Sequence, residues 1–299
     1  MLLLIRPAAF ALNAQTAVNN YFQHEKVEDD AISIQAAALS EFDALVDSLH
    51  AADIETVVVQ DTAEPHTPDS IFPNNWVSFH EEGHVLYPMF AANRRLERGH
   101  DIWSSLPPST CLLDLSDEEN HGRYLEGTGS LVLDRKHRVA YAALSARTHA
   151  DLVLRWCEVM NYTPVVFNAM QTVDGKRLPI YHTNVMISVG EGFALWCPST
   201  IDDESEREKV EQSLSAGKSE LIAISEEQMH AFAGNVLQVF NRKNEPFILM
   251  SAAAEAALRG PALIALQQQG TILSSPIPTI ERYGGGSVRC MVAEVIGNR

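Results

Sequence analysis

Apolar and polar residues alternate along the chain in a pattern that predicts short buried strands separated by amphipathic helices. Between residues 34 and 49, apolar side chains recur at the spacing of one helical face (Ile34, Leu39, Phe42, Leu45, Val46 and Leu49), which predicts a helix. The apolar runs 2–5 and 54–60 flank this helix and predict strands. Two further strands, 76–79 and 84–88, are joined by the turn Glu81-Glu82-Gly83.

This order of strand, strand, helix and strand returns at intervals of roughly 60 residues, a period typical of a propeller-like array. Strand pairs are predicted at 131–133 with 139–143, at 185–189 with 193–197 and at 236–240 with 247–250, helices at 148–160, 203–214 and 252–268, and closing strands at 164–167 and 221–224. Ser225 and Gln228 form a predicted capping box for a helix that ends near Gly234. About five units fit in the chain, so we expect an α/β fold in one domain covering residues 1–299.

The charge balance narrows the kinds of partner. The chain has 39 acidic and 22 basic residues, which gives a net charge of −17 at pH 7. Nucleic acids and anionic membranes bind through clustered positive charge, so we expect neither as a partner. A hydrophobic content of 46% is enough to bury a full core. We therefore expect a small-molecule substrate.

Four cysteines (Cys111, Cys157, Cys197 and Cys290) are too few and too scattered for a disulfide framework. None forms a Cys-x-x-Cys pair, so we expect neither a zinc ribbon nor thioredoxin chemistry, and no metal. The apolar start of the chain is interrupted at Arg6-Pro7, before a signal peptide's apolar core would be complete. No segment has the length of a membrane span, so a cytoplasmic protein is expected.

A glycine-rich stretch near the C-terminus contains the first candidate for chemistry. Gly284-Gly285-Gly286 predicts a bend in which the backbone adopts positive φ and approaches a small ligand closely. Cys290 follows and opens the apolar run 291–296, which predicts a strand. Cys290 is therefore a candidate nucleophile. The alternative is an inert core cysteine beside a glycine turn.

Three other polar segments precede predicted strands, at 68–76, 126–130 and 181–184. With Cys290 they supply an imidazole, His182, and two carboxylates, Asp69 and Glu126. A cysteine nucleophile needs a base or cation to form its thiolate, and a leaving amine needs a proton, which His182 can provide. Each residue also has a structural interpretation: Asp69 and Asn184 as turn residues, Glu126 as a strand-start cap, and His182 as an interior histidine. Their recurrence at equivalent points of a repeating unit favours the functional interpretation.

With this ordered set of motifs the sequence resembles the amidino-group hydrolases and transferases of the pentein fold, which include arginine deiminases, dimethylarginine dimethylaminohydrolases, agmatine deiminases and glycine amidinotransferases. The resemblance implies a five-bladed α/β propeller without a cofactor. It implies catalysis by Cys290, His182 and Glu126. It also implies substrate binding by the loop from Asp69 through Phe72 to Asn75, and carboxylate binding by Arg147 and, less directly, Arg94.

The chain departs from these relatives at Asn74, Asn75 and Asn184, where a guanidinium site often carries acids. A carboxylate only accepts hydrogen bonds, whereas an amide both donates and accepts, so amides suit a neutral ureido group. The whole pattern, with Arg6-Pro7, Asn13 and Asn19-Asn20, is similar to the citrulline-utilisation hydrolases related to arginine deiminase. The alternative is that Asn74 and Asn75 only stabilise a turn after Pro73.

The sequence thus favours a hydrolase that converts citrulline to ornithine, ammonia and carbon dioxide through an S-carbamoyl group on Cys290. The second hypothesis is an arginine deiminase or a dimethylarginine dimethylaminohydrolase that uses the same residues. The third is a non-catalytic, ribosome-binding protein of the same fold, which predicts loss of the nucleophile and base. Retained Glu126, His182 and Cys290, and the net charge of −17, count against the third. Assembly into a homo-oligomer is left open.

Overall fold

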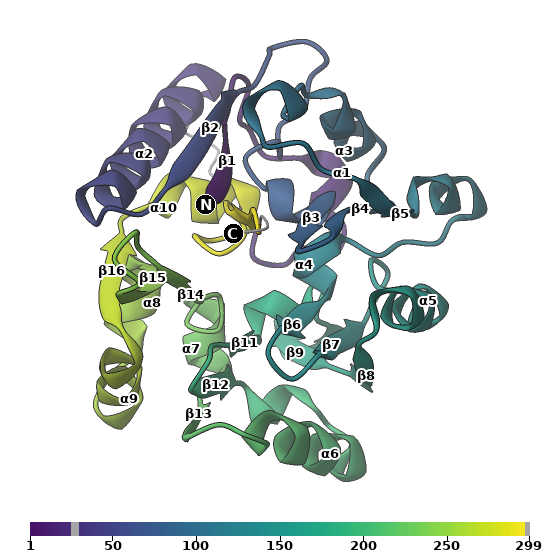
Figure 1. The fold of residues 1–299 in the computed structure, drawn as a ribbon, viewed down its shortest axis with the longest axis vertical. Coiled ribbons are helices and arrows are strands. Elements are labelled where there is room, and N and C mark those ends of the chain that lie inside the picture. The colour runs from purple at the N-terminus through teal and green to yellow at the C-terminus, as the bar shows by residue number, and fades with distance from the viewer. Residues whose placement is uncertain (25–29, 297–299) are drawn as a thin grey trace.

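The computed structural model describes residues 1–24 and 30–296, in which short sheets surround a central region and helices lie outside them (Figure 1). Five of the sheets have three strands, in the spatial orders β17-β1-β2, β3-β4-β5, β6-β7-β8, β11-β12-β13 and β14-β15-β16. The strands are β1 (Leu2–Arg6), β2 (Thr56–Gln60), β3 (Val77–His80), β4 (Gly83–Leu86), β5 (Cys111–Asp114), β6 (Val132–Asp134), β7 (Val139–Leu144), β8 (Thr163–Asn168), β11 (Ile187–Val189), β12 (Phe193–Trp196), β13 (Glu220–Ala223), β14 (Leu237–Phe240), β15 (Pro246–Ser251), β16 (Thr271–Ser275) and β17 (Ala293–Glu294).

All five sheets share one local connectivity. The middle strand pairs antiparallel with one neighbour and parallel with the other, which the chain reaches through a helical crossover. The crossover helices are α2 (Ala31–Ala51), α3 (Ala92–Arg95), α5 (Ala150–Met160), α6 (Glu204–Ser215), α8 (Ala252–Ala257) and α9 (Pro261–Gln269). The predicted strand-strand-helix-strand unit is confirmed in this connectivity.

The two ends of the described chain meet in a single sheet. Strand β17 pairs antiparallel with β1, with Leu2 opposite Glu294 and Leu3 opposite Ala293. Figure 1 shows both termini near the middle of the view. The N-terminal strand therefore holds in place the segment that carries Cys290.

Several predicted elements differ from the structure. The helix expected over 252–268 is broken into α8 and α9, because Gly260 adopts φ +61° and Pro261 begins a new helix. The strand expected over 291–296 is reduced to Ala293–Glu294, since Cys290 and Met291 lie in a turn. Among the elements that the apolar pattern did not indicate are β5, β16, the hairpin of β9 (Met170–Val173) and β10 (Lys176–Pro179), and α10 (Pro278–Gly284).

A tight turn precedes the outer strand that pairs antiparallel in each of the five three-stranded sheets. These turns are η1 (Pro73–Asn75), α4 (Gly127–Ser130), η5 (Thr183–Val185), the segment 232–235 after α7 (Glu226–His230), and the segment 287–290. We call this set of five turns the turn ring.

Hydrogen bonds join neighbouring members of the turn ring. Thr183 Oγ1 donates to the Ser130 carbonyl at 2.6 Å, and Asn235 Nδ2 donates to the Asn184 carbonyl at 2.9 Å. Asn74 Nδ2 donates to Thr128 Oγ1 at 3.3 Å, and η1 also contacts β17. Segments far apart in the sequence are thereby brought to one place.

The remaining short elements complete the path of the chain. They are α1 (Ala14–Ala17), η2 (Leu96–Gly99), η3 (Trp103–Ser105), η4 (Ser116–His121) and η6 (Pro198–Thr200). The capping box predicted for Ser225 and Gln228 is confirmed at the start of α7. Throughout residues 1–24 and 30–296, no helix is both long and apolar enough to cross a lipid bilayer.

Candidate active site

Cys290 ends the last turn of the turn ring and is held by hydrogen bonds on both sides. Its backbone N–H donates to the Ser287 carbonyl at 2.9 Å. Its Sγ accepts from Asn235 Nδ2 at 3.3 Å and from Asn184 Nδ2 at 3.6 Å. Burial raises the pKa of the Cys290 thiol above its usual value. The resting side chain is therefore a thiol that needs a base to become a nucleophile.

Asn235 was not identified from the sequence, although a signal was present. Asn235-Val236-Leu237 repeats the pattern of Asn184-Val185-Met186, an asparagine followed by two apolar residues just before the first strand of a sheet. Asn75-Trp76-Val77 and Cys290-Met291-Val292 occupy the corresponding places in two other sheets. Aligning the repeat units on this position would have indicated Asn235.

His182 precedes η5, and Glu126 precedes α4 in the neighbouring unit. His182 Nε2 lies 2.7 Å from Glu126 Oε2. A carboxylate only accepts, so Nε2 carries the proton and Nδ1 is the acceptor in the neutral ring. Burial lowers the pKa of His182 to about 4 and outweighs the opposing effect of Glu126. At neutral pH, His182 is therefore a neutral base oriented by Glu126.

Glu126 is itself fixed by its surroundings. Oε1 accepts from the Phe90 backbone N–H at 2.9 Å, and Arg147 Nη1 lies 3.5 Å from Oε2. Burial on its own raises the pKa of Glu126, but Arg147 and His182 outweigh it and bring the pKa down to about 2. Glu126 is thus a carboxylate at any physiological pH, and it stabilises a proton on His182 whenever one arrives.

The side chain of Asn75 has its orientation set by Arg94. Arg94 Nη1 donates to Asn75 Oδ1 at 2.7 Å, while Nε and Nη2 bind the two oxygens of Glu97 at 2.8 and 2.9 Å. A guanidinium only donates, so the Asn75 oxygen must face Arg94 and the amide nitrogen must face away. Asn75 Nδ2 is buried and has no hydrogen-bond partner among the residues that the structure describes. Glu97, the counter-ion behind this arrangement, had no sequence signal.

Asp69 presents the complementary unsatisfied group. Its Oδ2 accepts from Asn13 Nδ2 at 2.8 Å and from Thr16 Oγ1 at 3.1 Å. Its Oδ1 is buried, and nothing within residues 1–24 and 30–296 forms a hydrogen bond with it. Burial raises the pKa of Asp69, and Arg94 and these hydrogen bonds only partly oppose that effect.

A small cavity lies among these groups, with a volume of about 20 Å³, enough for about one water molecule. Of the residues proposed from the sequence, Cys290, His182, Asp69, Phe72, Asn75, Arg94 and Arg147 line it. Glu126, Asn74 and Asn184 do not: Glu126 binds His182, Asn184 binds Cys290, and Asn74 binds Thr128. A cavity of this size has to open before it can admit an amino acid.

Both arginines that the resemblance assigns to the substrate's carboxylate already bond to protein groups. Arg94 is committed to Glu97, Asn75 and the Phe72 carbonyl. Arg147 donates through Nε to Asn19 Oδ1 at 2.8 Å and through Nη2 to the Thr16 carbonyl at 2.7 Å. Its guanidinium also stacks on Tyr181. Arg94 acts through Asn75, whereas Arg147 connects Glu126 to the segment that contains α1.

The glycine stretch also differs from expectation. Only Gly285, at φ +62°, has the positive φ that was predicted for the bend, and Gly284 ends α10. A Cβ added at Gly284 or Gly286 would lie 2.7 or 3.0 Å from the Phe72 ring. These two glycines therefore serve close packing against Phe72, while Gly285 makes the turn.

In the part of the chain that the structure describes, no group of three or more His, Cys, Asp or Glu side chains is arranged to hold a metal ion. The groups that the structure does bring together are a buried thiol, a neutral imidazole oriented by a carboxylate, one unpaired amide donor and one unpaired carboxylate acceptor. This arrangement suits nucleophilic attack on a planar carbon that carries N–H donors and a carbonyl oxygen.

Comparison with known proteins gives one family match. Residues 6–297 match the sequence model of a family described as N,N dimethylarginine dimethylhydrolase, eukaryotic. No curated protein matches the chain.

Solved structures share the fold at low sequence identity. Apo ArgZ, an arginine dihydrolase from the ornithine-ammonia cycle in cyanobacteria, matches with a TM-score of 0.73 and 17% identity, over 99% of this chain and 41% of that one. A variant of AgrE in complex with L-arginine matches with a TM-score of 0.75 and 18% identity, over 100% of this chain and 40% of that one. A variant of DDAH from Pseudomonas aeruginosa complexed with citrulline matches with a TM-score of 0.68 and 15% identity, over 98% of this chain and 97% of that one. The chain thus spans about two fifths of ArgZ and AgrE.

We predict that His182 titrates near pH 4 and that Glu126→Gln lowers this pKa further, because Glu126 stabilises the charged ring. The unfolded histidine takes up its proton near pH 6.5, so the folded state loses stability as the pH falls from 6.5 toward 4. Imidazole NMR titration, with His182→Gln to assign the resonance, measures the pKa. A midpoint near 6.5 in the wild type would contradict the buried neutral base.

We also predict that Gly129→Ala reduces kcat/KM by roughly a hundredfold, the effect of displacing a catalytic group by about 1 Å. A Cβ at Gly129 would lie 2.4 Å from Asn75 Nδ2 and 2.8 Å from His182 Nδ1, so both must move. The matched control is Gly99→Ala, since a Cβ there meets no atom within 4 Å. Equal kinetics for the two variants, on any substrate the enzyme turns over, would show that these groups need not be where the structure places them.

Proposed function

The chain belongs to the N,N dimethylarginine dimethylhydrolase family, and we propose that it hydrolyses a neutral ureido amino acid, L-citrulline. Membership places it in the pentein superfamily of amidinotransferases and dimethylarginine hydrolases. It is a hydrolase of non-peptide C–N bonds in amidino-type groups that uses a cysteine nucleophile. The proposal adds the substrate, the nucleophile Cys290 and the roles of the residues around it.

The observation that carries the proposal is the pairing of one unsatisfied donor with one unsatisfied acceptor in the cavity. Asn75 Nδ2 is the donor and Asp69 Oδ1 the acceptor. A ureido group presents one carbonyl oxygen and several N–H donors, so it satisfies both. A guanidinium presents only donors and would leave Asn75 Nδ2 unpaired, at a cost of about 1–3 kcal/mol. Arg94 prevents the amide from turning over to avoid this loss.

Each residue then has a chemical role in cleavage of the ureido group. The Cys290 proton passes to His182 Nδ1, and the imidazolium is stabilised by Glu126. Sγ attacks the ureido carbon, and the bond to the side-chain nitrogen of ornithine breaks as His182 returns its proton to that nitrogen. Asn184 and Asn235 donate to the sulfur. A bound cation would lower the pKa of the Cys290 thiol, but the ureido group of the substrate is neutral. The thiolate therefore forms only when His182 takes the proton of the thiol.

The second half of the reaction regenerates the thiol. His182, neutral again, takes a proton from water as the water attacks the S-carbamoyl carbon. The C–S bond breaks, the sulfur recovers the proton, and the released carbamic acid breaks down to ammonia and carbon dioxide. The substrate's α-carboxylate pairs with Arg147 when the cavity opens, because Arg147 lines the cavity and its Nη1 makes, among the described residues, just one long hydrogen bond, of 3.5 Å to Glu126.

The proposal includes the architecture. The five three-stranded sheets are the blades of a five-bladed α/β propeller in one domain over residues 1–299, with β17 and β1 closing one blade. The turn ring lies at the centre, where the first strands of the blades converge. The citrulline complex of the Pseudomonas aeruginosa variant supports a ureido amino acid as a ligand of this fold. The ArgZ and AgrE likeness supports arginine as the substrate to test against it.

We predict that citrulline exceeds arginine in kcat/KM and that Asn75→Asp narrows or reverses this preference. A carboxylate at residue 75 repels the ureido oxygen and attracts a guanidinium. The loss or gain of one charge-assisted hydrogen bond, about 1.5–3 kcal/mol, corresponds to a change in kcat/KM of roughly tenfold to a hundredfold. Steady-state kinetics with citrulline, arginine, dimethylarginine and agmatine measure the preference.

The matched control is Asn244→Asp, which changes an exposed asparagine that does not line the cavity. It should leave the ratio of kcat/KM for citrulline to kcat/KM for arginine unchanged. Cys290→Ser should abolish turnover of every substrate because it removes the thiol at nearly constant volume. Efficient turnover of arginine or dimethylarginine by the wild type, with citrulline inert, would contradict the ureido substrate and leave an amidino hydrolase.

A further inference from the structure

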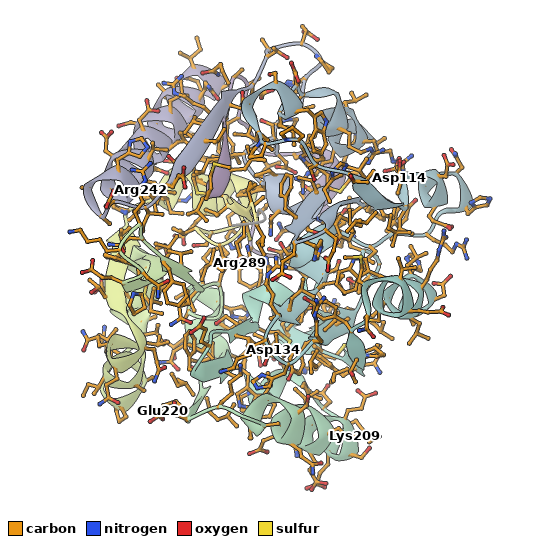
Figure 2. All side chains as sticks on the ribbon, viewed as in Figure 1. Asp114, Asp134, Lys209, Glu220, Arg242 and Arg289 are labelled. Carbon is orange, nitrogen blue, oxygen red and sulfur yellow. The ribbon has the colours of Figure 1, made fainter. Side chains whose placement is uncertain are left out.

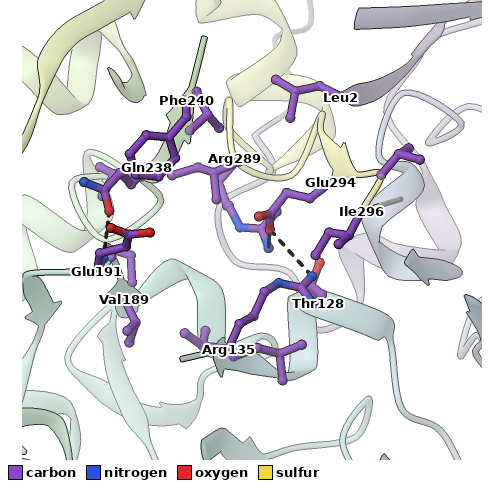
Figure 3. A pocket seen from close by; sticks show the side chains of 18 of the residues that line it. Leu2, Thr128, Arg135, Val189, Glu191, Gln238, Phe240, Arg289, Glu294 and Ile296 are labelled. Atoms are coloured by element: carbon purple, nitrogen blue, oxygen red, sulfur yellow. Dashed lines mark hydrogen bonds and ion pairs between the residues drawn. The ribbon is translucent and has the colours of Figure 1, made fainter. Parts of the chain in front are cut away.

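A second, much larger cavity lies beside the turn ring and shares no lining residue with the small one. Its volume is about 860 Å³, within the range of sites that bind small molecules. Three of its lining residues belong to the turn ring: Thr128, Asn184 and Arg289, the residue before Cys290. Figure 3 shows Thr128 and Arg289 among the side chains around this cavity.

One wall of the large cavity holds two guanidiniums and a single carboxylate. Glu294 Oε2 lies 3.9 Å from Arg135 Nη2 and 3.7 Å from Arg289 Nη2 (Figure 3). Both distances exceed that of a good hydrogen bond, so Glu294 satisfies neither guanidinium fully. Arg289 is 11% exposed, and its Nη1 donates to the Val292 carbonyl at 3.2 Å. Burial lowers the pKa of Arg289, and Glu294 compensates only in part.

The opposite wall carries a carboxylate without a counter-ion. Glu191 lies across the cavity from Arg289 and Arg135, beside Gln238 (Figure 3). Its backbone N–H donates to Gln238 Oε1 at 2.7 Å. No ion pair within residues 1–24 and 30–296 involves Glu191, whereas Asp134, another lining carboxylate, pairs with Lys218 at 2.8 Å. The lining also includes Lys136 and Glu55, whose Oε1 lies 3.9 Å from Arg242 Nη2. Arg135 and Arg289 thus share one weakly bound carboxylate at one wall, and Glu191 lies at the other.

We propose that this cavity is a second binding site, for a small carboxylate whose anionic group is held between Arg135 and Arg289. The carboxylate supplies the charge-assisted hydrogen bonds that Glu294 makes poorly. Glu191 favours a ligand that also carries an ammonium group at its other end, so acids with a terminal amino group and simple organic acids are the two sources. Arg135 and Glu191 lie outside the small cavity, although Asn184, which lines this one, also donates to Cys290 Sγ.

The test is isothermal titration of the Cys290→Ser protein, which removes turnover. Three probes of equal chain length separate the charges: 5-aminopentanoate, pentanoate and pentylamine. We expect 5-aminopentanoate to bind more tightly than pentanoate, and pentylamine not to bind. Equal affinity for the first two probes would assign the site to simple organic acids. Binding of pentylamine alone, or of none of the three at millimolar concentration, would overturn the proposal.

Variants of the wall locate the bound probe. Arg135→Met should weaken pentanoate binding about tenfold, the effect of one charge-assisted hydrogen bond. Glu294→Gln should strengthen pentanoate binding, because it removes the carboxylate that competes for the two guanidiniums. If the cluster were merely structural, the two variants would not change the affinity for pentanoate in opposite directions. Lys209→Met removes an exposed cation of α6 at the outer edge of the molecule (Figure 2) that does not line the cavity, so it is the control and should change nothing. Equal effects of Arg135→Met and Lys209→Met would also overturn the site.

Discussion

Burial is the constraint on which the candidate active site depends. His182, Asp69, Asn75, Arg94, Arg147 and Cys290 are each at most 4% exposed. A buried polar group must have a partner, because water cannot satisfy it. Nearly every polar atom around the cavity does, and the network of Glu97, Arg94 and Asn75 leaves one amide donor facing inward. The two atoms left without a partner among the described residues, Asn75 Nδ2 and Asp69 Oδ1, therefore indicate that the ligand presents one acceptor and one donor.

The same burial sets the protonation states. It lowers the pKa of His182 and raises that of Cys290, so the resting pair is a neutral base and a thiol. Glu126 stays ionised only because Arg147 and His182 oppose the cost of burying its charge. A site that holds its own base in the neutral form can activate the thiol for an uncharged substrate. The electrostatics and the donor pattern thus favour the same class of ligand.

The fold supports this site through repetition, and repetition also explains what the sequence could predict. Apolar periodicity located the strand-strand-helix-strand units, because the pattern is fixed by which face of each element is buried. It predicted β17 as too long and missed the break before α9, because a turn at Cys290 and the Gly260-Pro261 pair override the apolar run. The short strands β5 and β16 were missed because their residues are mostly half-buried or exposed.

Cys290, His182 and Glu126 were identified from motifs, and their positions in the structure agree with the proposed roles, which await experiment. Asn235 and Glu97 were missed for different reasons. Asn235 repeats a pattern that is visible in the sequence, whereas Glu97 has meaning only once the side chain of Arg94 is placed against Asn75. The resemblance assigns Arg94 and Arg147 to the substrate's carboxylate, and motifs in one sequence could not show that both already bond to protein groups.

The central claim is that Cys290 carries the substrate carbon as an S-carbamoyl group. The most direct measurement is rapid acid quenching during turnover, followed by mass spectrometry of the Cys290 peptide. The account predicts a carbamoyl adduct on Cys290 with citrulline, and none on Cys111, Cys157 or Cys197. Two results would contradict the account. One is an amidino adduct on Cys290 formed from arginine, with no carbamoyl adduct from citrulline. The other is turnover of citrulline in which acid quenching traps an adduct on another residue and leaves Cys290 unmodified.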